Sequence, residues 1–335
     1  MKVLRIVIVC ILAMGLLAAV SFAEEETYTL RFNTVAGPNE PQTLAMQKFA
    51  DVVGELSGGK IVVKVFHSGA LGDQKTSLLN IKRGTLEMST DASPAWFAEL
   101  CNYPEIGILE LPYVFRDLDH LYRVLTGPIG QKRWDYLAET SGIRVIDVWY
   151  LGTRELNLIE KAGVVRRPED LKGIVLRMPG TEAWLDVGRA LGAEPTPLGF
   201  GEVYMALKTG TIDGQDNPLP TDYSAKFCEV THYIVLTDHM IGYVTPIINE
   251  KLWKEMPEKY RVYIKKAIQV ARFYMNRIVL EQEVTLLGKF VKDYGMEIII
   301  PEKEAFMESA KKFYTQPRFN EIWGEGMYER IQSSD

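Results

Sequence analysis

A run of residues near the carboxyl end carries one uninterrupted helical pattern, and it constrains the fold more than any other feature of the chain. From Glu258 to Asp293 there is no proline, and Gly288 is the only glycine. Apolar residues recur at the three- and four-residue spacing of a helix, from Ile264 to Val291. Because this run exceeds the usual length of a helix in a globular domain, we expect one long helix, or two joined by a bend, that reaches across two domains.

The chain before residue 150 alternates strand and helix signals. Apolar and polar residues alternate from Tyr28 to Phe32, helical spacing follows, and the dipeptide Gly58-Gly59 ends that helix. This alternation predicts a largely parallel sheet covered by helices. The expected elements are strands over 28–32, 61–66, 86–89 and 143–149, and helices over 49–56 and 73–83.

A second α/β region begins near Tyr150. We expect a strand over 174–178 and then a helix with Thr181 as its N-cap. Two prolines predict a loop over 193–199, and a helix is expected over 200–208. The chain has 335 residues, and single cores stop growing near about 250–300 residues. The patterns therefore indicate an α/β fold with two domains.

The charge of the chain excludes one class of partner. The formal net charge is −6, and the first 23 residues contain two basic residues and no acid, so 36 basic residues remain against 44 acidic ones. Nucleic-acid backbones require clustered Lys and Arg, so we expect no nucleic-acid partner. A small anionic ligand stays compatible, because it responds to the local field of a cleft.

The first residues have the pattern of a secretory signal peptide. A basic region ends at Arg5, an apolar stretch runs over 6–20, and Ser21 and Ala23 supply the small residues that precede a cleavage site. The stretch is short for a membrane span of about 20 residues, and an uncleaved signal anchor is the alternative. We expect residues 1–23 to be removed after Ala23, and the mature protein to be soluble and exported.

Residues that commonly carry catalysis or bind metals are sparse. Cys101 and Cys228 are the only cysteines beyond the signal, and we expect them not to pair. Four histidines and no Cys-x-x-Cys motif predict no metal site. No nucleophile elbow, zinc-protease motif or phosphate loop is present. We expect no cofactor and no enzymatic activity, although the numerous Asp and Glu leave a catalytic pair open on spacing alone.

Arg177 is the strongest candidate for ligand binding. It stands at the carboxyl end of the expected strand 174–178 and before a Pro-Gly turn, at the edge where open α/β sheets bind ligands. Its guanidinium offers a fork of donors that matches a carboxylate through two parallel hydrogen bonds. The alternative is a structural salt bridge with a neighbouring acid, and the residues alone leave both open.

Four further residues are weaker candidates. Arg154 follows a strand after a short loop, and Asn217 lies in the polar turn at 213–218. An asparagine amide can donate to a carboxylate and accept from a hydroxyl. Phe200 and Trp96 are aromatic residues next to turns. The alternative to ligand binding is a surface position for Arg154, a turn position for Asn217, and a place in the core for Phe200 and Trp96.

Several motifs follow one another in a fixed order along the chain. The run from 176 to 218 contains Leu-Arg-Met-Pro-Gly, then Gly-Ala-Glu-Pro-Thr-Pro-Leu-Gly-Phe-Gly-Glu-Val-Tyr-Met-Ala-Leu-Lys-Thr-Gly, then Asp-Gly-Gln-Asp-Asn-Pro. Further motifs are Phe-His-Ser-Gly-Ala-Leu-Gly-Asp from Phe66, Leu-Pro-Tyr-Val-Phe-Arg-Asp from Leu111 and Arg-Pro-Glu-Asp-Leu-Lys-Gly from Arg167. Together they resemble the extracytoplasmic solute receptors of TRAP transporters, the DctP-type family.

The resemblance implies a periplasmic-binding-protein-like α/β fold, in which two domains close on the ligand around a hinge. The chain crosses between the domains more than once, so both are discontinuous, and the long helix is shared by both. Domain I is expected to comprise residues 24–150 and about 240–280, and domain II residues 151–239 and about 281–335. The ligand cleft lies between the two.

The resemblance also implies roles for particular residues. Arg177 takes the place of the arginine that forms the selectivity-setting salt bridge with the ligand carboxylate. Arg154 matches a second carboxylate contact, and Asn217 matches an asparagine that contacts the same region. Phe200 matches an aromatic residue that packs on the ligand. The motif departs from the common family pattern at Asp216, where Glu is usual.

Two residues fall in segments that line the first-domain side of the cleft in the family, Asn39 and Trp96. The segment 89–96 is expected to lack the extra charged contacts that some sialic-acid receptors place there. On that premise sialic acid is disfavoured, and a smaller sugar acid, hydroxy acid or keto acid remains open.

The function that the resemblance implies is that of a periplasmic solute-binding protein. It captures a small organic acid and delivers it to the membrane permease of a TRAP transporter, and we expect it to be monomeric. A ligand-sensing module for a signalling receptor is the first alternative, and an enzyme on the same scaffold is the second. Neighbouring genes for one small and one large TRAP membrane subunit would favour transport over sensing.

Overall fold

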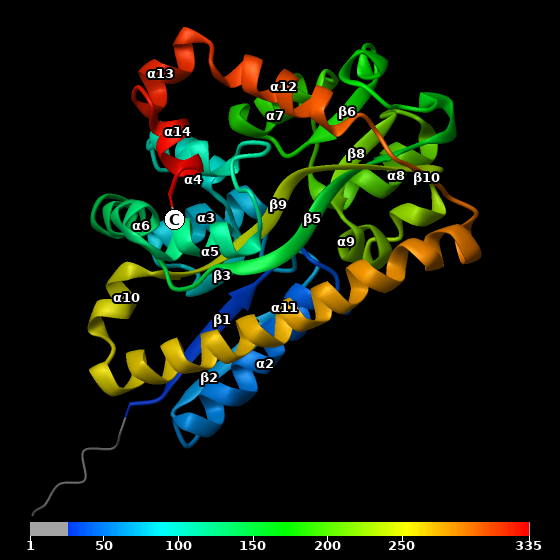
Figure 1. The fold of residues 1–335 in the computed structure, drawn as a ribbon. Coiled ribbons are helices and arrows are strands. Elements are labelled where there is room, and N and C mark those ends of the chain that lie inside the picture. Colours follow the sequence, from blue (N-terminus) through cyan, green and yellow to red (C-terminus); the bar gives the residue numbers. More distant parts are fainter. Residues whose placement is uncertain (1–25, 335) are drawn as a thin grey trace, which may run out of the picture.

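The computed structural model describes residues 26–334 as a mixed α/β protein built on one ten-stranded sheet (Figure 1). The predicted signal peptide and its cleavage site lie outside the described residues. The strands follow the order β2-β1-β3-β9-β5-β8-β6-β7, and β4 and β10 each pair with β9. Within residues 26–334, no helix combines the length and apolarity needed to cross a membrane.

Three parallel strands form one end of the sheet. β1 (Tyr28–Asn33) pairs with β2 (Ile61–Phe66) on one side and with β3 (Met88–Ala92) on the other. α2 (Pro41–Leu56) and α3 (Gln74–Arg83) connect these strands. The predicted alternation of strands and helices is confirmed in this region.

A second parallel group forms the other end of the sheet. β6 (Val175–Met178) lies between β7 (Glu194–Pro197) and β8 (Gly214–Pro218) and runs parallel to both. The prediction of a loop over 193–199 is wrong, because β7 is an edge strand and an edge tolerates prolines. The prediction of a polar turn over 213–218 is also wrong, since most of this motif forms the fully buried strand β8.

Two long antiparallel strands join the two groups. β9 (Tyr233–Asn249) pairs with β3 and with β4 (Ile143–Val145) near its carboxyl end, and with β5 (Trp149–Leu158) over most of the rest. β5 is also antiparallel to β8. The sheet is therefore mixed, and the prediction of a largely parallel sheet holds only for its two ends.

The single strand expected over 143–149 is interrupted. β4 and β5 both pair with β9, and the break between them lies opposite Pro246 of β9. The Ile146 N–H still donates to the Pro246 carbonyl oxygen at 2.9 Å, but proline has no N–H to return a bond, and the regular ladder resumes only at Trp149. Arg154 consequently lies inside β5, and the expectation that it follows a strand after a loop is wrong.

The run that constrains the fold is a single helix, α11 (Glu258–Tyr294). It packs against α2, crosses β5 and reaches α9 (Leu219–Ser224), so it extends along both ends of the sheet (Figure 1). One face buries Ile264, Ile268 and Met275 in a core beneath the first group of strands. The prediction of one long helix is confirmed.

The carboxyl-terminal helices lie on the side of the sheet away from α11 (Figure 1). α12 (Lys303–Tyr314) packs against α7 (Glu182–Leu191), and α13 (Pro317–Trp323) packs against the 3-10 helix η1 (Pro104–Glu110). The division into two domains at the bounds given above stays a prediction.

The remaining elements are α4 (Pro94–Leu100), α5 (Leu118–Thr126), α6 (Pro128–Ser141), α8 (Val203–Thr209), α10 (Glu250–Glu255), α14 (Met327–Gln332), β10 (Glu297–Ile299), η2 (Glu160–Ala162), η3 (Pro168–Leu171), η4 (Phe200–Glu202) and η5 (Phe227–Glu229).

Several local predictions are confirmed at single residues. The Thr181 side chain accepts a hydrogen bond from the backbone N–H of Trp184 at the start of α7, and Gly192 ends that helix in the left-handed conformation. Cys101 and Cys228 are buried free thiols, as expected.

β5 and β9 pass from one strand group to the other at a pair of glycines. Gly152 has a φ of +120°, and a Cβ built there would lie 2.6 Å from the Cβ of Pro218. A Cβ on Gly242 would lie 2.7 Å from the carbonyl oxygen of Gly152. Glu283 of α11 accepts a hydrogen bond from the backbone N–H of Thr153 at 2.7 Å. The crossing therefore requires glycine and is tied to the long helix.

Replacement of Gly152 by alanine tests this packing. We expect Gly152→Ala to lower the free energy of unfolding by about 2–4 kcal/mol, because a disfavoured φ and an overpacked contact each cost roughly 1–3 kcal/mol. Gly142→Ala is the matched control, since Gly142 has a φ of +69° and nothing within 4 Å of the added Cβ, and should cost roughly 1–2 kcal/mol. Equal losses in chemical denaturation would contradict the close approach at Gly152.

Candidate functional site

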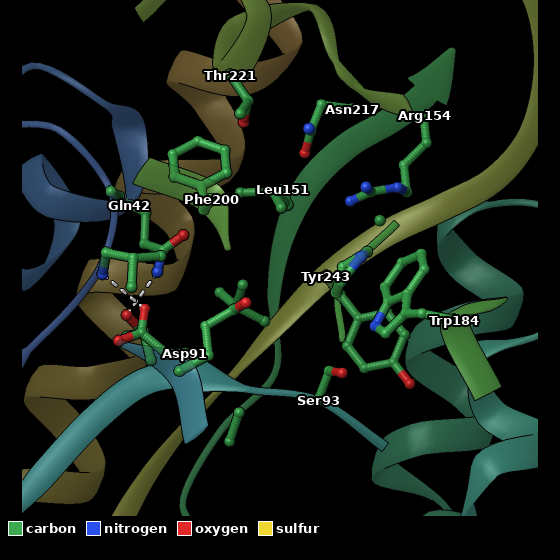
Figure 2. A pocket seen from close by; sticks show the side chains of 18 of the residues that line it. Gln42, Asp91, Ser93, Leu151, Arg154, Trp184, Phe200, Asn217, Thr221 and Tyr243 are labelled. Atoms are coloured by element: carbon green, nitrogen blue, oxygen red, sulfur yellow. Dashed lines mark hydrogen bonds between the residues drawn. The ribbon is translucent and has the colours of Figure 1, made fainter. Parts of the chain in front are cut away.

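One cavity brings together side chains from both halves of the chain (Figure 2). Four residues that the sequence singled out line it together: Arg154, Arg177, Phe200 and Asn217. The residues before position 150 contribute the facing wall. Its polar members are Glu40, Gln42, Gln74, Thr90, Asp91, Ser93 and Glu110.

The other two residues that the sequence singled out lie elsewhere. Trp96 is 6% exposed, packs in the core and lines an adjoining cavity together with Phe200. Asn39 is exposed and lines neither of these two cavities. Its neighbours Glu40 and Gln42 line the main cavity instead. The ligand-binding roles of all six candidates stay predictions.

Arg177 reaches the cavity from the carboxyl end of β6. Its side chain is almost fully buried, and its Nε donates a hydrogen bond to the carbonyl oxygen of Leu198 at 2.8 Å. Burial lowers the pKa of the Arg177 guanidinium to about 10, so the group remains a cation at neutral pH. No acid among the described residues forms a salt bridge with it; Asp216 is engaged by Arg154 and His239. The structural salt bridge that the sequence left open is therefore not formed.

Arg154, in contrast, is held by a buried acid. Its Nε donates to Oδ2 of Asp216 at 2.7 Å, and its Nη2 donates to the backbone carbonyl oxygen of Asp216 at 2.6 Å. His239 Nε2 lies 3.1 Å from the same Oδ2. Burial by itself would raise the pKa of Asp216, but Arg154 and His239 hold that pKa well below its usual value. Asp216 is thus an anion that neutralises Arg154.

Two aromatic side chains shape the cavity near these arginines. The guanidinium carbon of Arg154 lies 4.7 Å from the centre of the Trp184 ring, a cation–π contact. Phe200 packs edge-on against Phe227, with ring centres 5.9 Å apart. Figure 2 shows Trp184 below Arg154 and Phe200 between Gln42 and Asn217. Trp184 packs against the Arg154 guanidinium, and both rings add apolar surface to the lining.

A direct contact crosses the cleft between the two halves. Thr221 Oγ1, in α9, donates a hydrogen bond to Oε1 of Glu40 at 2.8 Å, and Glu40 directly precedes α2. Both side chains are buried. On the same side as Thr221, the Asn217 amide donates to Oε1 of Gln215. The two walls therefore touch at this point.

The wall from the first half is acidic. Asp91 accepts a hydrogen bond from the Thr34 hydroxyl at 3.0 Å, and Glu110 accepts one from the backbone N–H of Ala95 at 3.2 Å. Burial raises the pKa of each of these two carboxyl groups to about 7. Asp91 lines the cavity, so the segment 89–96 contributes one acidic group to it. The expectation that this segment lacks the extra charged contacts of some sialic-acid receptors, and that sialic acid is disfavoured, stays a prediction.

The sequence analysis missed several cavity residues, and only some of them lie next to residues that it identified. Trp184 lies in the first turn of the helix that follows Arg177, and Thr221 lies just after the Asp-Gly-Gln-Asp-Asn-Pro motif, so their neighbours pointed to them. Glu40 and Glu110 carry no comparable signal. Their place in the cavity depends on how the first strand group faces the second, which no local pattern records.

The family model described as "Bacterial extracellular solute-binding protein, family 7" matches residues 32–320 of this chain. The chain is also similar to the sialic acid-binding periplasmic protein SiaP of Vibrio cholerae serotype O1. The two are 32% identical over 94% of this chain and 95% of that protein.

Solved structures with the same fold include two TRAP periplasmic solute-binding proteins. One, from Roseobacter denitrificans with bound 3-deoxy-D-manno-oct-2-ulosonic acid, is 33% identical, with a TM-score of 0.86 over 92% of this chain and 99% of that one. The other, from Sulfurospirillum deleyianum with bound succinate, is 30% identical, with a TM-score of 0.83 over 92% of this chain and 100% of that one.

Substitution of Asp216 tests the buried ion pair. Asp216→Asn leaves the Arg154 charge buried without its anion, and breaking a buried pair in this way costs about 3–5 kcal/mol. Asp293→Asn is the control, because Asp293 forms an exposed pair with Lys289 at 4.0 Å and should change the unfolding free energy by less than about 1 kcal/mol. A loss for Asp216→Asn as small as that of the control, in chemical denaturation, would refute the role assigned to Asp216.

The acidic wall predicts a pH dependence of stability. The folded pKa of Asp91 and Glu110 is about 7, above their ordinary values of 3.8 and 4.5. Each group therefore contributes stability that is fully present below its unfolded pKa and is lost as the pH rises through about 7. We expect the ligand-free protein to gain unfolding free energy from pH 8 to pH 5.5 relative to the double variant Asp91→Asn, Glu110→Gln. Parallel pH profiles for the two proteins would show that these carboxyl groups are not responsible.

Proposed function

The chain belongs to bacterial extracellular solute-binding protein family 7, and we propose that it captures a small organic acid through a salt bridge between Arg177 and the ligand carboxylate. The family and its relatives are substrate-binding proteins of transporters, not enzymes. The proposed ligand is a sugar acid, a hydroxy acid or a keto acid, which the protein delivers to the membrane permease of a TRAP transporter.

One observation carries the proposal: Arg177 is a buried cation that forms no salt bridge with any acid of residues 26–334. Asp216 and Glu202 act on the guanidinium only through their fields, and burial still lowers its pKa, so these acids do not fully offset the cost of removing the charge from water. A ligand carboxylate supplies that charge and accepts two parallel hydrogen bonds from the guanidinium fork. The acids bound by the relatives described above, sialic acid, an octulosonic acid and succinate, share a carboxylate group.

The neighbours of Arg177 are assigned supporting roles in this proposal. Arg154 directs its remaining donors to the same carboxylate, Asn217 contacts the adjacent part of the ligand, and Phe200 packs on its carbon chain. Trp96 and Asn39 belong to the first-half side, where they act on the shape and the entrance of the cleft.

Ligand capture is proposed to proceed by closure of two domains around the crossing of β5 and β9. The Thr221–Glu40 hydrogen bond supports this, because it joins opposite walls of the cleft. Contacts from a ligand to both walls favour the closed state over the open one. The protein acts in the periplasm as a soluble monomer, after cleavage of the signal peptide behind Ala23.

Variants of Arg177 test the proposal in a thermal-shift screen of the mature protein against organic acids. A ligand at 100 times its dissociation constant stabilises the folded state by about 2.7 kcal/mol. We expect Arg177→Ala and Arg177→Lys to abolish or badly weaken this stabilisation and to leave the apo protein folded, because alanine removes the charge and lysine lacks the bidentate fork.

Arg83→Ala is the control, because Arg83 is an exposed arginine at the end of α3, and it should keep the full ligand response. Unchanged ligand affinity in either Arg177 variant would contradict the carboxylate assignment. A screen in which only neutral sugars or amines stabilise the protein would contradict the proposed function as a whole.

A further inference from the structure

We propose that a cavity between α4, η1, α7 and α13 is a second ligand site, and that it binds a small amine cation with one aromatic ring. Its lining residues include none of those that line the cavity of Arg177. The site is therefore separate from the one assigned to the acid ligand, and its occupant has the opposite charge.

The cavity has the size of a molecule with one ring. Its volume is about 210 Å³, and an apolar cavity of about 150 Å³ is large enough to hold benzene. Small residues leave this space open where α4, η1 and α7 meet. A Cβ built on Gly107 would lie 3.7 Å from the Cβ of Ala98 and 3.9 Å from the Cβ of Ala183, and all three residues line the cavity.

Aromatic side chains of the carboxyl-terminal helices form another part of the lining. Tyr314 ends α12, and Phe319 and Trp323 belong to α13. The rings of Phe319 and Trp323 are stacked, with centres 4.5 Å apart, and the centre of the Tyr314 ring lies 5.1 Å from that of Phe319. Aromatic rings pack well against other rings, and their faces attract cations. This wall favours an aromatic ligand with a positive charge.

The charged groups of the lining are all acids. Glu99, Glu182 and Asp186 line the cavity, and no Lys, Arg or His of residues 26–334 lines it with them. Arg189 Nη1 lies 2.6 Å from a carboxylate oxygen of both Glu182 and Asp186, and Arg318 pairs with Asp186 at 3.0 Å. Glu99 is exposed and forms no salt bridge within the described part of the chain. Three acids thus face two arginines, and an ammonium group balances the remaining negative charge.

An unsatisfied hydroxyl points independently to a polar ligand. Tyr314 is 5% exposed, and its hydroxyl has no hydrogen-bond partner among residues 26–334. The charges of Asp186 and Arg318 act on this hydroxyl through space, and Asp186 lines the same cavity. A buried hydroxyl is normally paired. A hydroxyl on the ligand ring supplies the missing partner, so the expected ligand resembles tyramine.

The test compares molecules that differ from tyramine in one group. Isothermal titration calorimetry of the mature protein would use tyramine, phenethylamine, tyrosol and hydroxyphenylpropionate. We expect tyramine to bind one-to-one, and tyrosol about tenfold more weakly, because it loses the attraction of the acids and of the rings. Phenethylamine lacks one hydrogen bond and should bind about fivefold more weakly. Hydroxyphenylpropionate has the wrong charge and should bind more weakly than tyrosol.

A variant of Glu99 assigns the charge effect to the rim. Glu99→Gln removes one exposed charge and keeps the shape, so it should weaken tyramine binding about threefold at low salt and leave tyrosol binding unchanged. Glu105→Gln is the matched control, because Glu105 is exposed on η1 and does not line this cavity. It should leave the affinities of both molecules unchanged.

A variant of Tyr314 assigns the hydroxyl contact. Tyr314→Phe keeps the ring and removes only a hydroxyl without a partner, so the protein should stay folded. We expect tyramine and phenethylamine to bind this variant equally well. A fivefold preference for tyramine that persists in Tyr314→Phe would show that the ligand does not contact this hydroxyl.

The outcomes do not depend on acid capture by Arg177. Tyramine should bind Arg177→Ala as tightly as the unaltered protein, and a loss of binding there would place the amine in the other cavity and overturn the proposal. If neither amine binds, the second site is refuted, while the acid screen decides the proposed function by itself. Equal affinities for tyramine, tyrosol and hydroxyphenylpropionate would refute the preference for a cation.

Discussion

The ion pair between Arg154 and Asp216 is the interaction on which the electrostatics of the site depend. It joins β5 to β8 inside the sheet, and His239 and Trp184 complete the surroundings of the two side chains. Because the Asp216 carboxylate is hydrogen-bonded to Arg154, it forms no salt bridge with Arg177 and acts on that guanidinium only through its field. The cavity therefore keeps one positive charge for a ligand, although two arginines line it. If Asp216 paired with Arg177 instead, the same residues would form a self-satisfied core.

The cleft exists because continuous elements connect its two walls. β5 and β9 run from one strand group into the other, and α11 packs against β5 as well as against α2 and α9. Gly152 and Gly242 permit the close crossing of the strands, and Glu283 ties the helix to it. In the closure proposed above, motion of one wall relative to the other is concentrated at these few backbone positions. Such hinges absorb dihedral changes without disturbing the packed cores on either side.

Patterns along the chain predicted elements well where local chemistry determines them. The long helix, the N-cap at Thr181 and the position of Arg177 at the end of a strand all follow from spacing and capping residues. The errors arose where tertiary pairing overrides local preference. Two prolines fit an edge strand, a Gly-Asp-Asn-rich motif became the buried strand β8, and Pro246 on a distant strand divided the one expected over 143–149.

The candidate site could be predicted on one side only. Motifs of the second half pointed to Arg177, Arg154, Phe200 and Asn217, which share one cavity. The acids of the first half carry no motif, and their meeting with the arginines depends on contacts between segments far apart in sequence.

The most direct test of the central claim, that Arg177 recognises a single ligand carboxylate, is a calorimetric comparison of the tightest-binding acid with its primary amide. The amide keeps the shape and the hydroxyls but has no charge. We predict that it binds at least about 100-fold more weakly, as expected when one partner of a buried charge pair is lost. Equal affinities of the acid and the amide would contradict the account.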